Sequence, residues 1–113
     1  MPFISMNTNV KLTQEKILEL KAEAGRVLAL IPGKNESQLM VQINEGQNMF
    51  FKGEDVPCMM VQVNCYGQAA KEDLDPFVKE LAASIEKVTG VPAGNQYLTI
   101  DGYANWGVAG KYV

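Results

Sequence analysis

The chain has 113 residues, of which 47% are hydrophobic and 20% charged, and its formal net charge is −3. This length fits one domain, residues 1–113, with a modest core. The acidic balance gives no electrostatic reason to expect a nucleic acid or an anionic membrane as a partner. The absence of histidine excludes histidine-dependent catalysis and argues against a metal site. No stretch approaches the roughly 20 apolar residues of a membrane span, and the start lacks a secretory signal, so a cytoplasmic protein is expected.

The N-terminus carries the most informative residue, because Pro2 directly follows Met1. An apolar run from Phe3 to Met6 and the sequence Asn7-Thr8-Asn9-Val10 predict a buried strand over residues 3–10. Removal of Met1 would expose the secondary amine of Pro2. An α-amino group has a pKa of roughly 7.7 to 8.0, and burial disfavours its charged form, so a buried amine suits general-base catalysis near neutral pH. Alternatively, Pro2 only protects the terminus and begins an edge strand.

The first helix is predicted over residues 17–31, where apolar side chains recur at helical spacing. Thr13 can cap its start, and Pro32-Gly33 ends it. Strands are predicted at residues 38–44, 49–51 and 58–66. In the two longer strands apolar residues alternate with amides, which indicates one apolar and one semi-polar face.

A second helix is predicted because apolar side chains recur at helical spacing from Leu74 to Val88; Asp75-Pro76 is expected as its cap and first position, and Gly90 as its stop. A last strand follows at residues 96–100. Cys58 and Cys65 are seven residues apart on one predicted strand, so they should point to opposite faces and should not pair.

The two halves of the chain resemble each other. Ile31-Pro32-Gly33 matches Val88-Thr89-Gly90 at an offset of 57, and Pro2-Phe3 resembles Pro57-Cys58 at an offset of 55. These matches predict a duplicated βαβ unit. Right-handed crossovers would place both helices on one side of a four-stranded sheet. The uncovered, half-apolar side favours oligomerisation.

Seven short motifs, in this order and at these spacings, resemble one known family. They are Met1-Pro2, Asn7-Thr8-Asn9-Val10, Gly33-Lys34, Phe51-x-Gly53 with Pro57-Cys58, Tyr66-Gly67, Tyr97, and Asn105-Trp106-Gly107. The family is that of macrophage migration inhibitory factor and D-dopachrome tautomerase, within the tautomerase superfamily. The resemblance implies an α+β tautomerase fold, with a four-stranded mixed sheet and two helices on one face. It also implies a homotrimer with active sites between the subunits.

The resemblance further implies an isomerase that needs no cofactor. Pro2 would be the base in keto–enol tautomerisation of an arylpyruvate such as phenylpyruvate, or in isomerisation of a dopachrome-type compound. Lys34 corresponds to the lysine that holds the carboxylate or carbonyl oxygen of this small 2-keto acid substrate. Tyr97 corresponds to a pocket tyrosine from the neighbouring subunit.

The remaining pocket positions depart from the family pattern. Tyr66 stands where isoleucine is common, Thr99 replaces an asparagine, and Gln38 replaces a tyrosine after Lys34. Trp106 precedes the tail glycine instead of following it, and it is expected either to form a pocket wall or to anchor the tail to another subunit. Structural alternatives also exist for Lys34, as a solvated residue at a helix end, and for Tyr97, in ordinary sheet packing.

Two other functions are compatible with the sequence. One is a cytokine-like signal that is secreted without a signal peptide, contacts a cell-surface receptor and has only vestigial tautomerase activity. The other is dehalogenation or decarboxylation of a three-carbon acid by the terminal proline. The second is disfavoured because the chain has one arginine, Arg26, on the first predicted helix, where paired guanidinium groups would be needed.

Overall fold

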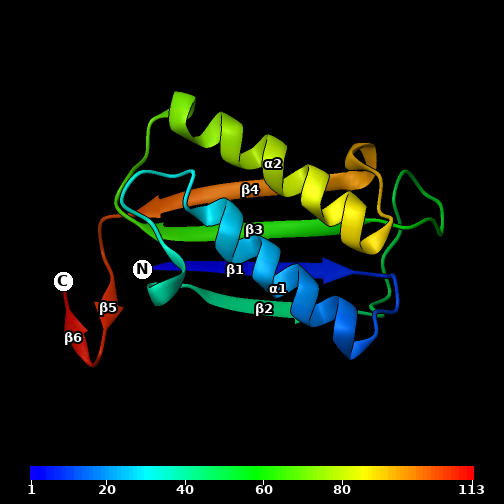
Figure 1. Ribbon diagram of the computed structural model, residues 1–113, viewed down its shortest axis with the longest axis horizontal. Coiled ribbons are helices and arrows are strands. Elements are labelled where there is room, and N and C mark those ends of the chain that lie inside the picture. Colours follow the sequence, from blue (N-terminus) through cyan, green and yellow to red (C-terminus); the bar gives the residue numbers. More distant parts are fainter.

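The computed structural model describes residues 1–113 as an α+β fold, in which two helices cover one face of a four-stranded mixed sheet (Figure 1). The sheet has the order β2-β1-β3-β4 and consists of β1 (Pro2–Thr8), β2 (Met40–Asn44), β3 (Met59–Tyr66) and β4 (Gln96–Tyr103). The helices are α1 (Gln14–Leu28) and α2 (Lys71–Thr89), with short 3-10 turns η1 (Glu36–Gln38) and η2 (Ala93–Asn95). Strands β5 (Gly107–Val108) and β6 (Lys111–Tyr112) form a separate C-terminal hairpin. The predicted fold class is confirmed.

The strand registers agree with the predicted duplication. In the first half Phe3 of β1 lies opposite Met40 of β2, and in the second half Met60 of β3 lies opposite Tyr97 of β4, each residue 57 positions after its counterpart. Both of these pairs are parallel, whereas β1 and β3 run antiparallel. The sheet is therefore two βαβ units related by a local two-fold rotation.

The axis of this rotation passes between Ser5 and Gln62, which face each other across β1 and β3 and are also 57 residues apart. By the same offset, the counterpart of Pro2 is Met59. The proposed match of Pro2-Phe3 with Pro57-Cys58 is therefore wrong by two residues, because it rested on a shared proline and not on the strand register.

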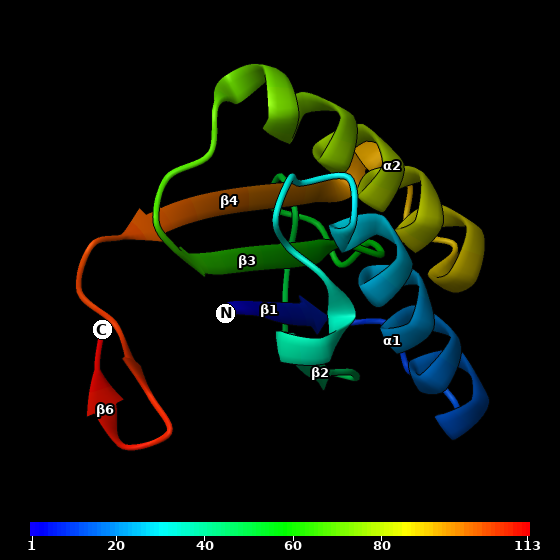
Figure 2. The same ribbon diagram turned by 60° about the vertical axis from the view of Figure 1, so that its left-hand side comes forward.

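The core lies between the helices and one face of the sheet, and the other face is open (Figure 2). Inward-facing residues alternate with outward-facing ones along the strands, as predicted. The inward residues of β1 and β3 and their helical partners are fully buried: Ile4, Met6, Val61, Val63, Leu20, Val27, Phe77 and Leu81. The central row of the open face is polar and runs Gln42, Ser5, Gln62, Thr99 from β2 to β4. Both cysteines are free, in agreement with the expectation that they do not pair, and both are buried; Cys58, however, lies just before β3 and not on it.

Helix α1 begins at the predicted cap, because the Thr13 side chain accepts a hydrogen bond from the Lys16 amide at 3.2 Å. It ends at Leu28, three residues earlier than predicted. Leu30 and Ile31 instead donate to the carbonyls of Val27 and Leu28 in successive tight turns, at 3.0 Å each. These hydrogen bonds span three residues instead of four, so they tighten the chain after α1 and turn it toward η1.

Helix α2 begins at Lys71, so the predicted start at Asp75-Pro76 is wrong and Pro76 lies inside the helix. The Ala70 carbonyl accepts hydrogen bonds from the Asp73 and Leu74 amides, at 3.0 and 3.1 Å, which starts the helix one turn earlier. Pro76 leaves the carbonyl of Glu72 without its usual partner. Glu72 is exposed, so the cost is small there. Neither helix is long and apolar enough to cross a lipid bilayer.

The segment at residues 49–51 is not a strand of the sheet, contrary to prediction. Phe51 makes only an isolated antiparallel bridge to Glu54, through backbone hydrogen bonds of 2.9 and 3.0 Å. The Asn9 side chain instead ties both ends of this loop, donating to the carbonyls of Met49 and Val56 at 3.0 and 2.7 Å. Asn9 thus lies beyond the end of β1, which stops two residues before the predicted Val10.

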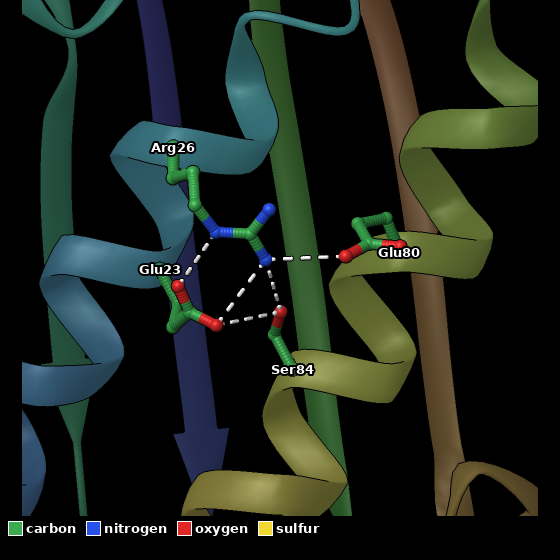
Figure 3. Close-up of polar contacts among 4 residues, drawn as sticks. All are labelled: Glu23, Arg26, Glu80 and Ser84. Carbon is green, nitrogen blue, oxygen red and sulfur yellow. Dashed lines mark hydrogen bonds and ion pairs between the residues drawn. The ribbon is translucent and has the colours of Figure 1, made fainter.

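The two helices are joined by a polar cluster around Arg26 (Figure 3). Its guanidinium donates to Glu23 at 2.8 and 3.2 Å, to Glu80 of α2 at 3.1 Å and to the Ser84 hydroxyl at 3.2 Å. The hydrogen bond from Arg26 is the main cause that lowers the pKa of the Glu23 carboxyl. The single arginine of the chain therefore serves as a helix-to-helix contact.

We expect Gly90→Ala to destabilise the fold. Gly90 ends α2 with φ at 79°, in the left-handed region where a side chain costs about 1–2 kcal/mol. The matched control is Gly94→Ala, because Gly94 lies at ordinary φ with no atom within 4 Å of an added Cβ. Urea unfolding should show a lower midpoint for Gly90→Ala alone. Equal midpoints for the two variants would contradict the assigned role of Gly90.

Candidate active site

Pro2 lies buried at one end of the sheet, where the start of β1 meets the ends of β3 and β4. Pro2 faces Cys65 of β3, and Cys65 faces Gly102 of β4. Strand β1 is an interior strand, paired on both sides, so the alternative in which Pro2 begins an edge strand is wrong. Proline is tolerated here because it is the first residue of the strand, where its missing N–H interrupts no ladder.

The terminal amine of the chain belongs to Met1 and lies near the polar side chains of Gln38 and Lys34. It donates a hydrogen bond to Gln38 Oε1 at 3.2 Å, and the Met1 carbonyl accepts one from the Tyr66 amide at 3.4 Å. Burial lowers the pKa of this amine, and the positive charge of Lys34 lowers it further, while Cys65 acts in the opposite direction. The environment at this end of the sheet therefore favours a neutral amine.

Lys34 lies at the same end of the sheet, in the loop after α1. Its Nζ donates to the Tyr66 carbonyl at 2.9 Å, which fixes the half-buried side chain against the end of β3. Lys34 and Cys65 line a cavity of only about 40 Å³. That volume holds little more than a water molecule, so Lys34 adjoins a space too small for an aromatic ring.

A larger cavity of about 370 Å³ borders Pro2, and its size falls within the range of small-molecule sites. Its walls come from the start of β1, from η1 and β2, and from the C-terminal hairpin. Most of the lining residues are apolar. The full lining consists of Met1, Pro2, Phe3, Gln38, Met40, Trp106, Gly107, Val108 and Ala109. The half-buried Trp106 thus lies in the same cavity as Pro2, and its ring is 6.2 Å from that of Tyr103.

Two predicted site residues lie elsewhere in the single chain. Tyr97 is 63% exposed near the start of β4, where its ring packs edge-on against Phe51 at 5.5 Å. It is five residues from Gly102, which is level with Pro2, and this spacing corresponds to about 17 Å along a strand. Thr99 is exposed on the open face of the sheet. The chain alone therefore brings Pro2 and Trp106 to one cavity and places Lys34 and Tyr66 at the same end of the sheet, whereas Tyr97 and Thr99 lie away from it.

Cys65 was not predicted as a site residue, and Gln38 was named only as a pocket position that departs from the family pattern; both border the terminal amine. The predicted strand over residues 38–44 begins instead at Met40, and Gln38 belongs to the 3-10 turn η1. This turn leads into β2 beside β1, and the hydrogen bond from the Met1 amine places Gln38 at the terminus. No three carboxylate, thiol or imidazole side chains are grouped so that they could bind a metal ion.

Comparison with known proteins gives a consistent relationship. The sequence model of the family described as macrophage migration inhibitory factor matches residues 1–109. A macrophage migration inhibitory factor homolog from Trichuris trichiura is 29% identical over 98 residues, which cover 87% of this chain and 85% of the homolog.

Solved structures show the same fold. MIF2 from Leishmania major superimposes with a TM-score of 0.92 at 26% identity, over 100% of this chain and 97% of its own. Pt0534, solved after inactivation by 2-oxo-3-pentynoate, superimposes with a TM-score of 0.85 at 19% identity, over 96% and 93% of the two chains. The match along nearly the whole sequence and the shared fold show that this chain belongs to the macrophage migration inhibitory factor family, within the tautomerase superfamily.

Proposed function

We propose that this protein is a keto–enol tautomerase of arylpyruvate-like 2-keto acids or dopachrome-type compounds, in which the Pro2 amine, freed by removal of Met1, is the base. The observation that carries the proposal is the burial of Pro2 beside an apolar cavity of about 370 Å³ that also contains Trp106. Tautomerase activity is a property of macrophage migration inhibitory factor proteins. Inactivation of the structural neighbour Pt0534 by a 2-oxo acid adds support for this substrate class.

The chemistry needs one group that both accepts and returns a proton. A neutral Pro2 amine takes a proton from the carbon next to the substrate carbonyl and delivers it to the oxygen, so that C–H is exchanged for O–H and no cofactor takes part. Lys34 does not line the cavity beside Pro2 in the single chain, but its ammonium acts on the nearby terminal amine, and we propose that its positive charge also attracts the substrate carboxylate. The same charge disfavours a second cation on Pro2, as it does on the Met1 amine.

We further propose that the working enzyme is a homotrimer with sites between subunits. One face of the sheet is open and carries Tyr97 and Thr99, which lie too far along β4 to reach Pro2 of their own chain. A neighbouring subunit would have to bring these side chains to the cavity beside Pro2. The alternative of a receptor-binding signal remains a prediction, to be tested by the receptor response of a catalytically inactive Pro2→Gly variant.

Replacement of Pro2 tests the base. Pro2→Gly should lower kcat/KM for phenylpyruvate by about 100-fold or more, because the rigid secondary amine is lost. Pro92→Gly is the control, since Pro92 is exposed near η2, away from the cavity. Mass spectrometry must first show that both proteins lack Met1. Equal activity of Pro2→Gly and the control would refute the assignment.

Replacement of Lys34 tests whether its positive charge lowers the pKa of the terminal amine. Because the base is active when neutral, kcat/KM should rise as the pH increases through the pKa of the amine. Lys34 lowers that pKa, so Lys34→Met should move this acid limb of the pH profile to higher pH. Lys79→Met, which removes an exposed charge on α2, should not move it. An unmoved acid limb in Lys34→Met would show that Lys34 does not influence the base.

Mixing of subunits tests the assembly. Sedimentation should give three times the mass of one chain, and Pro2→Gly and Tyr97→Ala should each be nearly inactive. Unfolded, mixed and refolded together, the two variants should regain activity, because some sites would combine Pro2 of one subunit with Tyr97 of another. A mixture no more active than its components would contradict a shared site.

A further inference from the structure

We propose that the side-chain amide of Gln38 hydrogen-bonds the substrate oxygen that gains the proton during enolisation, which makes Gln38 a catalytic residue. This inference rests on the tautomerase function proposed above and assigns one more group to the same site. It begins from Gln38 Oε1, which lies 3.2 Å from the amine of Met1.

The backbone fixes where Gln38 stands. Gln38 is the last residue of η1, which is capped by Asn35 through a 3.0 Å hydrogen bond from the Ser37 amide. Strand β2 begins two residues later, where Met40 pairs with Phe3 of β1. The turn and the strand therefore hold the backbone of Gln38 at the cavity, from which its side-chain amide reaches the Met1 amine.

Removal of Met1 would open the space that its amine fills. The nitrogens of consecutive residues in an extended chain are about 3–4 Å apart, so this space is adjacent to the Pro2 nitrogen. An atom there can approach both Pro2 and Gln38 within hydrogen-bond distance. The substrate oxygen must lie near Pro2 to receive a proton from it, and this space fulfils that condition.

The amide also has the right chemistry. It can donate from Nε2 to a carbonyl or enolate oxygen, and it can accept at Oε1 from the enol hydroxyl. Among the other lining side chains only Trp106 has a strong hydrogen-bonding group, and the indole can only donate. Gln38 can therefore keep a hydrogen bond to the substrate oxygen in the keto, enolate and enol forms. As the C–H bond breaks, its electrons form C=C and the carbonyl oxygen becomes an enolate. The enolate oxygen then takes the proton from Pro2.

Substitution of Gln38 should distinguish a hydrogen bond to the reacting oxygen from a side chain that only lines the cavity. Gln38→Met keeps the length of the side chain but removes the amide, and kcat for phenylpyruvate should fall about tenfold or more, the value of one hydrogen bond to a charged oxygen. KM should change little, because the bond strengthens only as charge develops on the oxygen. Gln14→Met, on an exposed residue at the start of α1, is the matched control and should behave as wild type.

A binding measurement keeps this inference separate from the function on which it rests. The side-chain amide ¹⁵N resonance of Gln38, assigned by its loss in Gln38→Met, should shift when phenylpyruvate is added to Met1-processed protein. A shift in a protein without turnover would support the contact and refute the tautomerase. An unshifted resonance, or a Gln38→Met variant with raised KM and unchanged kcat, would overturn the proposed role of Gln38.

Discussion

The start of the chain is fixed inside the sheet, and the candidate active site depends on this constraint. Most chain termini fray because few interactions hold them, but β1 is paired with β2 on one side and with β3 on the other. The first residues therefore stay buried, and burial is the leading cause of the lowered amine pKa. The pairing with β3 places Cys65 beside Pro2, and the turn that leads into β2 places Gln38 beside the Met1 amine. A weakly paired first strand would give none of these contacts a fixed geometry.

Much of the fold could be predicted because local chemistry and packing agree. The cap at Thr13 and the helix end at Gly90 follow from the need of helix ends for hydrogen-bond partners. Apolar and polar side chains alternate along β2 and β3 because helices cover only one face of the sheet. The errors occur where tertiary context prevails over local preference. Pro76 marks a helix start in isolation, yet Ala70 begins α2 earlier, because one lost hydrogen bond at an exposed turn costs little.

The site was less predictable, because its residues are assembled by strand register and not by short motifs. The N-terminal position of Pro2 is visible in the sequence, and the loop after α1 brings Lys34 to the same end of the sheet. The contact of Gln38 with the terminal amine becomes visible only when η1 is placed beside the start of β1. For Tyr97 and Thr99 the obstacle is larger, since both lie on the open face of the sheet away from Pro2, and only the assembly proposed above would bring them to the cavity.

The local two-fold rotation gives the sheet two ends with equivalent backbone geometry, but only one of them carries a terminal amine. At the far end, Met59, Val91 and Asn95 take the positions that Pro2, Lys34 and Gln38 hold at the near end, 57 residues earlier. The nitrogen of Met59 belongs to a peptide bond and has no basicity, whatever side chain is placed around it. The local two-fold symmetry therefore repeats the scaffold at the far end without repeating the terminal amine, so only one end of the sheet can carry the base proposed above.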